Sequence, residues 1–360
     1  MSRMTVRAIL LEAWSDVVTG TARTTLFAAA LAAVVVTAIL TDVLAVRLLA
    51  ADADRFRSSG ATVLTVQAEG RIDGHRCENL GRIPGVRASG AVRETDSRLT
   101  SPALRGAPIP VSEVTSGFPR LLSNDVDHSG GVVLSNDAAD VFGVRPGGVA
   151  EAVEGRVRVA GRYDYPDDGR RPGYGYRALV TADARHSFDE CWVDAWPQIP
   201  NLRSLLLFTV RSDTGADDVR PLLGQLNSSH GERFDGRERF EARVSRFAPA
   251  IAGIVAFGLA TAAIRFRRIQ LASALHARVP RRDLLAVQML EASSWIVPAV
   301  CVGLALTALL AAGSAPGDRL TVAIIGSRIL AVAGLGALGG TAAGVLFTRE
   351  KHLFRYFKDR

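Results

Sequence analysis

Apolar residues are concentrated in four long runs along the chain. Residues 24–41, 247–264 and 292–317 contain no charged side chain, and residues 320–347 contain only Arg328. A helix needs about 20 mostly apolar residues to cross the hydrocarbon core of a bilayer. The pattern therefore predicts four transmembrane helices, which we place at residues 24–48, 247–264, 291–313 and 320–347.

The spacing of these runs is uneven, because about 200 residues separate the first run from the second, while the last three are close together. We expect an α-helical membrane protein with a large mixed α/β extracytoplasmic domain inserted between the first two transmembrane helices. The remaining expected parts are an amphipathic N-terminal segment (1–23), the inserted domain with stalk helices at its ends (49–246), a cytoplasmic segment (265–290) and a basic tail (348–360).

The distribution of charge predicts the orientation. Residues 51–245 carry 25 arginines and 28 acidic residues, whereas the rest of the chain carries 18 basic and 8 acidic residues. The excess lies in residues 3–23, 265–282 and 349–360, which the positive-inside rule places in the cytoplasm together with both termini. The basic clusters abut apolar runs and lack interleaved aromatic residues, so nucleic-acid binding is not expected. The first run is longer than a signal-peptide core, which favours a retained anchor over a cleaved signal.

The inserted segment shows strand and turn patterns. Residues 62–66 and 204–210 are rich in strand-forming residues. Residues 131–135 predict a strand that ends at Asn136 and Asp137, either of which can cap a helix through Phe142. A Pro-Gly turn at 145–148 precedes an alternating strand at 156–161. These elements predict a mixed α/β domain.

No catalytic or metal site is evident in the sequence. Only two basic residues are lysines, Lys351 and Lys358, and neither follows a glycine, so a P-loop ATP site is excluded. The six histidines are scattered without metal-ligand spacing, and the Gly-x-Ser-x-Gly, His-Glu-x-x-His and Cys-x-x-Cys motifs are absent. We therefore expect a non-enzymatic chain with no cofactor, and any ATP-Mg would be bound by a partner.

Two groups of residues in the insert are candidates for a specific role. Outside the cytoplasm a disulfide can form and persist, so Cys77 and Cys191 are a candidate pair; the alternative is two separate buried thiols. Four of the five tyrosines lie in a Gly- and Pro-rich stretch and form a candidate recognition loop; the alternative is that they pack onto their own domain. These tyrosines are Tyr163, Tyr165, Tyr174 and Tyr176.

The order of parts resembles the MacB/FtsX-type ABC permeases, also called type VII ABC transporters. Three stretches carry the resemblance: the basic and apolar run at 265–291, the strand, helix and Gly-containing pattern at 131–161 with Ile-Pro-Gly-Val at 83–86, and the small-residue run at 334–340. In the first stretch, Gln270 stands where the family has an acidic residue and His276 where it has a glycine.

The resemblance implies a dimeric permease whose cytoplasmic helix docks into a separate ABC ATPase of the MacB, FtsE or LolD kind. The implied partners also include a second permease copy or a paralogue, an extracytoplasmic protein and membrane lipids. The alternative for the helix is a membrane-surface helix whose arginines bind anionic lipid. The residues implied to couple the chain to the ATPase are Leu271, Ala274, Leu275, Arg278, Arg281, Arg282 and Glu291.

Two function classes follow from the resemblance. The first is export or extraction of a peptide, antibiotic, lipid or lipoprotein by mechanotransmission, in which stalk helices carry ATPase closure outward to the extracytoplasmic domain. The second is an FtsX-like regulator that activates an extracytoplasmic cell-wall hydrolase. The size of the insert favours transport. A receptor without an ATPase is a third class, and the match at 265–291 argues against it.

Overall fold

The computed structural model describes residues 5–20, 23–123, 130–212 and 220–348. They divide into two compact units, Met1–Ala50 with Gly236–Arg360 and Ala51–Asp235, which we call the helical unit and the inserted unit. The basic tail expected at 349–360 and Arg3 lie outside the described residues.

The helical unit contains four helices that are long and apolar enough to cross a membrane. These are the long helix α2 (Thr24–Ser58), α7 (Ala248–Phe266), α9 (Arg281–Ala312) and α10 (Arg319–Phe347). All four expected runs therefore lie in helices. Shorter elements complete the unit: α1 (Val6–Val18), α6 (Gly236–Ala242), the 3₁₀ turn η3 (Val244–Phe247) and α8 (Arg268–His276).

One apolar strip of each long helix forms the core of the helical unit. On α2, the buried residues Leu31, Val35 and Ile39 recur every four positions, so they share one helix face. They belong to a cluster with small residues of α7 and with Trp295 of α9. Large apolar residues on the opposite faces remain exposed.

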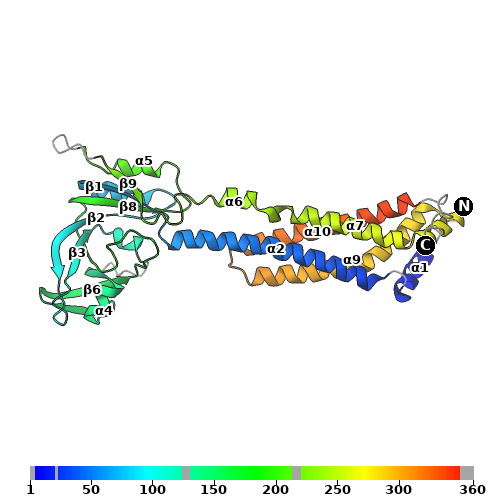
Figure 1. The fold of residues 1–360 in the computed structure, drawn as a ribbon, viewed down its shortest axis with the longest axis horizontal. Coiled ribbons are helices and arrows are strands. Elements are labelled where there is room, and N and C mark those ends of the chain that lie inside the picture. The colour runs from blue at the N-terminus through cyan, green and yellow to red at the C-terminus, as the bar shows by residue number, and fades with distance from the viewer. Residues whose placement is uncertain (1–4, 21–22, 124–129, 213–219, 349–360) are drawn as a thin grey trace. The chain divides into compact units, whose positions relative to one another are not determined.

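Helices α7 and α10 pack side by side and run in the same direction (Figure 1). Their backbones approach closely at Gly336, where an added Cβ would clash with the carbonyl oxygen of Gly253. One turn further along, a Cβ at Gly340 would clash with the carbonyl oxygen of Phe257. The small-residue run of the last helix is thus the surface on which α7 packs.

The inserted unit is built on a nine-stranded sheet in the order β5-β6-β4-β7-β3-β2-β8-β1-β9. Most neighbours are antiparallel, but β3 with β7 and β4 with β6 are parallel. The strands are β1 (Val63–Asp73), β2 (Val86–Leu99), β3 (Ile109–Val114), β4 (Val132–Ser135), β5 (Val149–Ala152), β6 (Gly155–Tyr163), β7 (Ala178–Thr181), β8 (Ser187–Ala195) and β9 (Leu222–Gln225).

Short helices cover parts of the sheet: α3 (Gly74–Asn79) with η1 (Leu80–Arg82), η2 (Phe118–Leu121), α4 (Asn136–Phe142) and α5 (Leu202–Leu207). Alternation along β8 separates two cores. Cys191 and Val193 pack with Leu202 and Leu206 of α5, whereas Trp192 packs on the other face with Phe118. The mixed α/β class expected from the sequence is confirmed.

Most local expectations hold in the inserted unit, and two need correction. The strands expected at 62–66, 131–135 and 156–161 are found in β1, β4 and β6. The strand expected at 204–210 is wrong, because most of this run is the helix α5. The cap of α4 is Ser135, whose side chain accepts a hydrogen bond from the N–H of Ala138 at 3.3 Å, and not Asn136 or Asp137.

The expected pair of stalk helices is only half present. At the first end, α2 continues without a break to Ser58. At the second end, the chain forms the seven-residue helix α6 and the turn η3, separated by Arg243 in an extended conformation. The second stalk is therefore not one continuous helix, because the extended residue Arg243 interrupts the helical hydrogen bonds.

Candidate functional site

The segment between α7 and α9 folds into a compact elbow, which we define as α8, the turn at 277–280 and the first turn of α9. Helix α8 ends where the N–H of Val279 donates to the carbonyl oxygen of Ala274 at 3.1 Å. Arg278 adopts the left-handed conformation with φ 63°, and Pro280 then caps α9 in an extended conformation. The backbone conformation that favours a glycine is thus at 278, two residues after His276, which stands where the resembled family has its glycine.

Leu271 anchors the elbow to the bundle. Its side chain is buried with Ile264 of α7 and Val345 of α10, and Leu284 and Leu285 of α9 pack against this cluster. Leu271 is therefore turned into the bundle, and its expected part in coupling to an ATPase stays a prediction. Its position fixes which face of α8 is turned outward.

The outward face of the elbow is basic. Arg278, Arg281 and Arg282 are exposed, and Ala274 and Leu275 are half-buried beside them. We call these five side chains the elbow surface. Three guanidinium groups flanking a small apolar strip can bind a surface that carries carboxylates around an apolar groove.

Glu291, the last residue expected to couple to a partner, faces inward. It is 4% exposed and forms an ion pair with Arg267, which also pairs with Asp16 of α1. Gln288 donates a hydrogen bond to the second carboxylate oxygen of Glu291 at 3.1 Å. Glu291 therefore links α9 to α1 and to the start of α8 through Arg267, and its expected coupling to an ATPase stays a prediction.

A second buried ion pair lies near the other end of the bundle. Asp42 of α2 is 3% exposed, and its Oδ1 accepts hydrogen bonds from Nε of Arg243 at 3.0 Å and from Oγ of Ser245 at 2.7 Å. Sequence reasoning did not find Arg243, Arg267 or Asp16 as members of these networks. The sequence held one signal for these pairs. Acidic and basic residues flank the apolar runs at ends that a four-helix topology places on the same side of the bundle.

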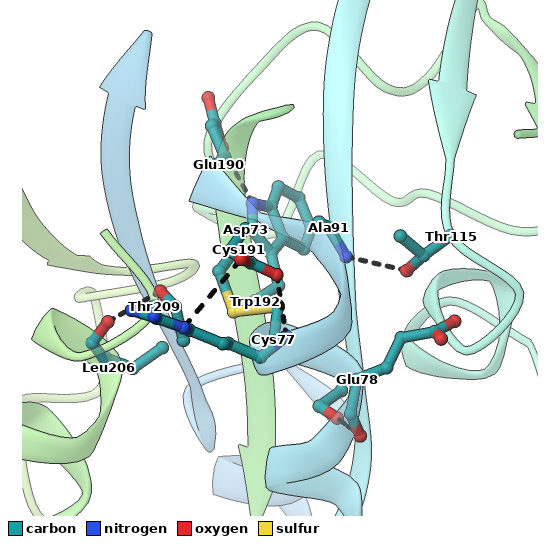
Figure 2. Close-up of a disulfide and its surroundings, with 12 residues drawn as sticks. Asp73, Cys77, Glu78, Ala91, Thr115, Glu190, Cys191, Trp192, Leu206 and Thr209 are labelled. Carbon is teal, nitrogen blue, oxygen red and sulfur yellow. Dashed lines mark hydrogen bonds and ion pairs between the residues drawn. A yellow bond between two sulfur atoms is a disulfide. The ribbon is translucent and has the colours of Figure 1, made fainter. Parts of the chain in front are cut away.

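In the inserted unit, Cys77 and Cys191 are joined by a disulfide between α3 and β8 (Figure 2). Both side chains are fully buried, and their Cα atoms are 5.8 Å apart. Asp73 caps α3 next to the disulfide by accepting a hydrogen bond from the N–H of Arg76 at 3.1 Å. The structure thus contains the candidate pair and not the two separate thiols.

The tyrosine cluster packs largely within its own domain. Tyr163 and Tyr174 are 2% and 5% exposed, and the hydroxyl of Tyr163 donates to the carbonyl oxygen of Tyr174 at 2.7 Å. Tyr174 packs edge-on against Trp192, with 4.9 Å between ring centroids. A recognition role is therefore wrong for these two buried side chains, because the core encloses them.

The other two tyrosines are half-buried and bound to the backbone. The hydroxyl of Tyr165 donates to the carbonyl oxygen of Arg171, and that of Tyr176 donates to the carbonyl oxygen of Ala107 at 2.9 Å. Burial raises the pKa of Tyr165 to about 12. These residues hold the loop in place, which agrees with the packing alternative.

The described residues do not form a candidate metal site. Among the described residues, no group of three or more His, Cys, Asp or Glu side chains is placed to hold a metal ion.

Comparisons with known proteins return solved structures only. No protein-family model matches the sequence. No curated protein matches it. The periplasmic region of MacB from Actinobacillus actinomycetemcomitans is 12% identical with a TM-score of 0.34, and the match covers 47% of this chain and 91% of that one. The extracellular domain of the noncanonic ABC-type transporter YknZ from Gram-positive bacteria is 14% identical with a TM-score of 0.27, covering 40% of this chain and 88% of that one. At TM-scores below 0.5, neither likeness carries a functional conclusion.

Proposed function

We propose that the chain is the permease subunit of an ABC transporter that works with a separate cytoplasmic ATPase. The elbow surface carries this proposal. Arg278, Arg281 and Arg282 are exposed on a segment whose opposite face Leu271 anchors in the bundle, so a force applied to the elbow acts on the helices. ATP-Mg is bound by the partner, since this chain lacks a P-loop.

The proposed topology places the elbow and both termini in the cytoplasm and the inserted unit outside it. The arginine-rich ends of the apolar helices support this orientation through the positive-inside rule. The Cys77–Cys191 disulfide supports it independently, because disulfides persist in oxidising compartments and are rare in the cytosol. The elbow surface would then face an ATPase, and the inserted unit would face the cargo.

Mechanotransmission is the proposed mechanism. Closure of two ATPase subunits displaces the elbow, and the Arg267 network carries the displacement to α1 and α9. Helix α2 is continuous from Thr24 to Ser58, so it transmits motion along its axis without a hinge. The proposed cargo is a peptide, antibiotic, lipid or lipoprotein taken from the membrane or the outer side, handled by a dimer of permease chains.

An affinity pull-down of the tagged full-length chain in mild detergent tests the partner. We expect an ABC ATPase to copurify with the wild type and to be lost from Arg281→Glu/Arg282→Glu. The matched control is Arg156→Glu/Arg158→Glu, which reverses two exposed charges on β6 of the inserted unit and should leave the ATPase bound. An intact wild-type chain without any ATPase would overturn the proposal. A cell-wall hydrolase that copurifies with the ATPase would favour the regulatory function.

A proline scan tests the mechanism. Leu48→Pro interrupts the continuous helix α2, because proline removes a hydrogen bond and clashes with the preceding turn. Val244→Pro is the control, since Arg243 already has the extended conformation that precedes proline. In the reconstituted complex, ATP with vanadate should change hydrogen exchange in the inserted unit of the wild type and of Val244→Pro. The change should disappear in Leu48→Pro while the ATPase remains bound; its persistence would argue against mechanotransmission through α2.

A further inference from the structure

Arg328 is an exposed cation within an apolar helix. It makes no hydrogen bond or ion pair with any other described residue, and it lies on α10 near the exposed side chains of Ile324 and Leu335. An ionised guanidinium in apolar surroundings is costly unless an anion pairs with it. No described residue of the chain supplies that anion to Arg328.

The packing of α7 against α10 sets the position of Arg328 along the bundle. An added Cβ at Gly253 would lie 2.8 Å from Val332, and the two helices run in the same direction (Figure 1). One turn earlier on each helix, Arg328 is level with Pro249. Arg246 precedes Pro249 by three residues and so lies about 5 Å before it along the direction of α7. Arg246 is exposed, and its guanidinium lies 4.6 Å from the ring centroid of Phe247.

The lengths of the apolar segments place Arg328 and Arg246 at a membrane boundary. Helix α7 has 19 residues and is about 28 Å long, close to the hydrocarbon core of about 30 Å. Arg328 precedes Phe347, the last residue of α10, by about 28 Å as well. If the chain spans the membrane as proposed above, Arg328 and Arg246 lie where the outer headgroups begin.

We propose that Arg328, together with Arg246, binds the phosphate of an outer-leaflet phospholipid. The acyl chains then lie against α7 and α10, past the exposed side chains of Ile254 and Leu335 and the small residue Gly339. A guanidinium group binds phosphate oxygens through charge-assisted hydrogen bonds, and its long apolar stem can extend along the helix to the headgroup.

The apolar helices of a second copy offer no free carboxylate at this level. Between the levels of the two buried ion pairs, the described parts of α2, α7, α9 and α10 contain no carboxylate other than Asp42 and Glu291 themselves. Both are buried and already paired. A lipid phosphate is the anion that is always present at this depth.

Native mass spectrometry of the full chain in detergent tests the site, with phosphatidylglycerol and diacylglycerol of the same acyl chains as probes. We expect phosphatidylglycerol to bind in preference to diacylglycerol. Arg328→Ala should weaken phosphatidylglycerol binding roughly five- to tenfold, Arg246→Ala should weaken it less, and Arg328→Lys should retain most of it. Arg319→Ala is the control, because it removes an exposed arginine of the same helix beyond the proposed boundary.

Equal binding of the two lipids, or unchanged binding by Arg328→Ala, would overturn the site. Loss of a protein subunit from Arg328→Ala, without a change in lipid adducts, would overturn it in favour of a protein partner. Membrane fractionation of the wild type distinguishes failure of the lipid site from failure of the proposed function. A chain found in the membrane with no lipid site defeats only this inference, whereas a chain outside the membrane defeats both.

Discussion

Arg243 donates a hydrogen bond to Asp42 at 3.0 Å, although 201 residues separate the two along the chain. Asp42 lies on α2 before the inserted unit, and Arg243 lies after it, just before α7. The pair therefore joins the two chain segments that enter and leave the inserted unit. It links α2 to the segment that leads into α7.

Loss of one member of this pair should be strongly destabilising. Asp42→Ala leaves a buried guanidinium without its carboxylate, and we expect a loss of about 3–5 kcal/mol in unfolding free energy. Asp42→Leu/Arg243→Leu should recover part of that loss. Asp52→Ala is the control, because the Asp52–Arg55 pair is exposed and should contribute less than about 1 kcal/mol. Thermal unfolding of the full chain in detergent measures these differences; equal effects of Asp42→Ala and Asp52→Ala would contradict the pairing.

Helix packing at Gly336 gives a second prediction. Gly336→Val introduces a Cβ that clashes with the backbone at Gly253, so we expect α7 and α10 to separate and stability to fall by about 1–3 kcal/mol or more. Gly334→Val is the matched control, since nothing lies within 4 Å of its added Cβ. The two variants should differ clearly in their thermal unfolding temperature, and similar temperatures would contradict the close approach.

The disulfide should stabilise the inserted unit. Cys77 and Cys191 close a loop with a sequence separation of 114, for which the chain-entropy model gives about 4–5 kcal/mol. Cys77→Ala/Cys191→Ala should lower the unfolding temperature of the full chain and abolish its dependence on dithiothreitol. Cys301→Ala should change neither property, because Cys301 is unpaired and exposed. Free Cys77 and Cys191 thiols in non-reducing mass spectrometry would refute the pairing.

Arg278 allows backbone strain to be separated from charge. Its φ of 63° is unfavourable for a residue with a side chain, so Arg278→Gly should be more stable than Arg278→Ala by about 1–2 kcal/mol. Both variants lose the guanidinium, so under the proposed function both should retain less ATPase in the pull-down. If Arg278→Ala were the more stable variant, the left-handed conformation would be wrong.

Asp73 predicts a pH dependence of stability. Burial opposes ionisation, but the N–H of Arg76 and the guanidinium of Arg211 outweigh it and hold the pKa of Asp73 below its ordinary value. Because the pKa is lower in the folded state, Asp73 stabilises the fold above its unfolded pKa of about 4 and loses this contribution as the pH falls through the folded value. Asp73→Asn retains a capping side chain without the charge. Unfolding measured from neutral to acid pH should show a smaller loss for this variant, and identical profiles would contradict the prediction.

The sequence alone determined the features that depend on local pattern. Four long apolar runs, of which only the last contains a charged residue, predicted four long helices, because helix length and apolar content are properties of consecutive residues. Alternating residues predicted β6, and a strand followed by two polar residues predicted β4 and α4, although the cap is Ser135 and neither of those two residues. The same local reasoning failed at 204–210, where leucines suited to a strand instead form α5 and cover one face of the sheet.

Tertiary structure alone decided which distant residues meet. It paired Asp42 with Arg243 and joined Arg267 to Asp16 and Glu291, and so turned an expected coupling residue inward. It also enclosed Tyr163 and Tyr174 in the core and left the elbow arginines exposed. The physical reason is that burial and ion pairing depend on what packs against a side chain in three dimensions, and residues far apart in sequence supply those neighbours.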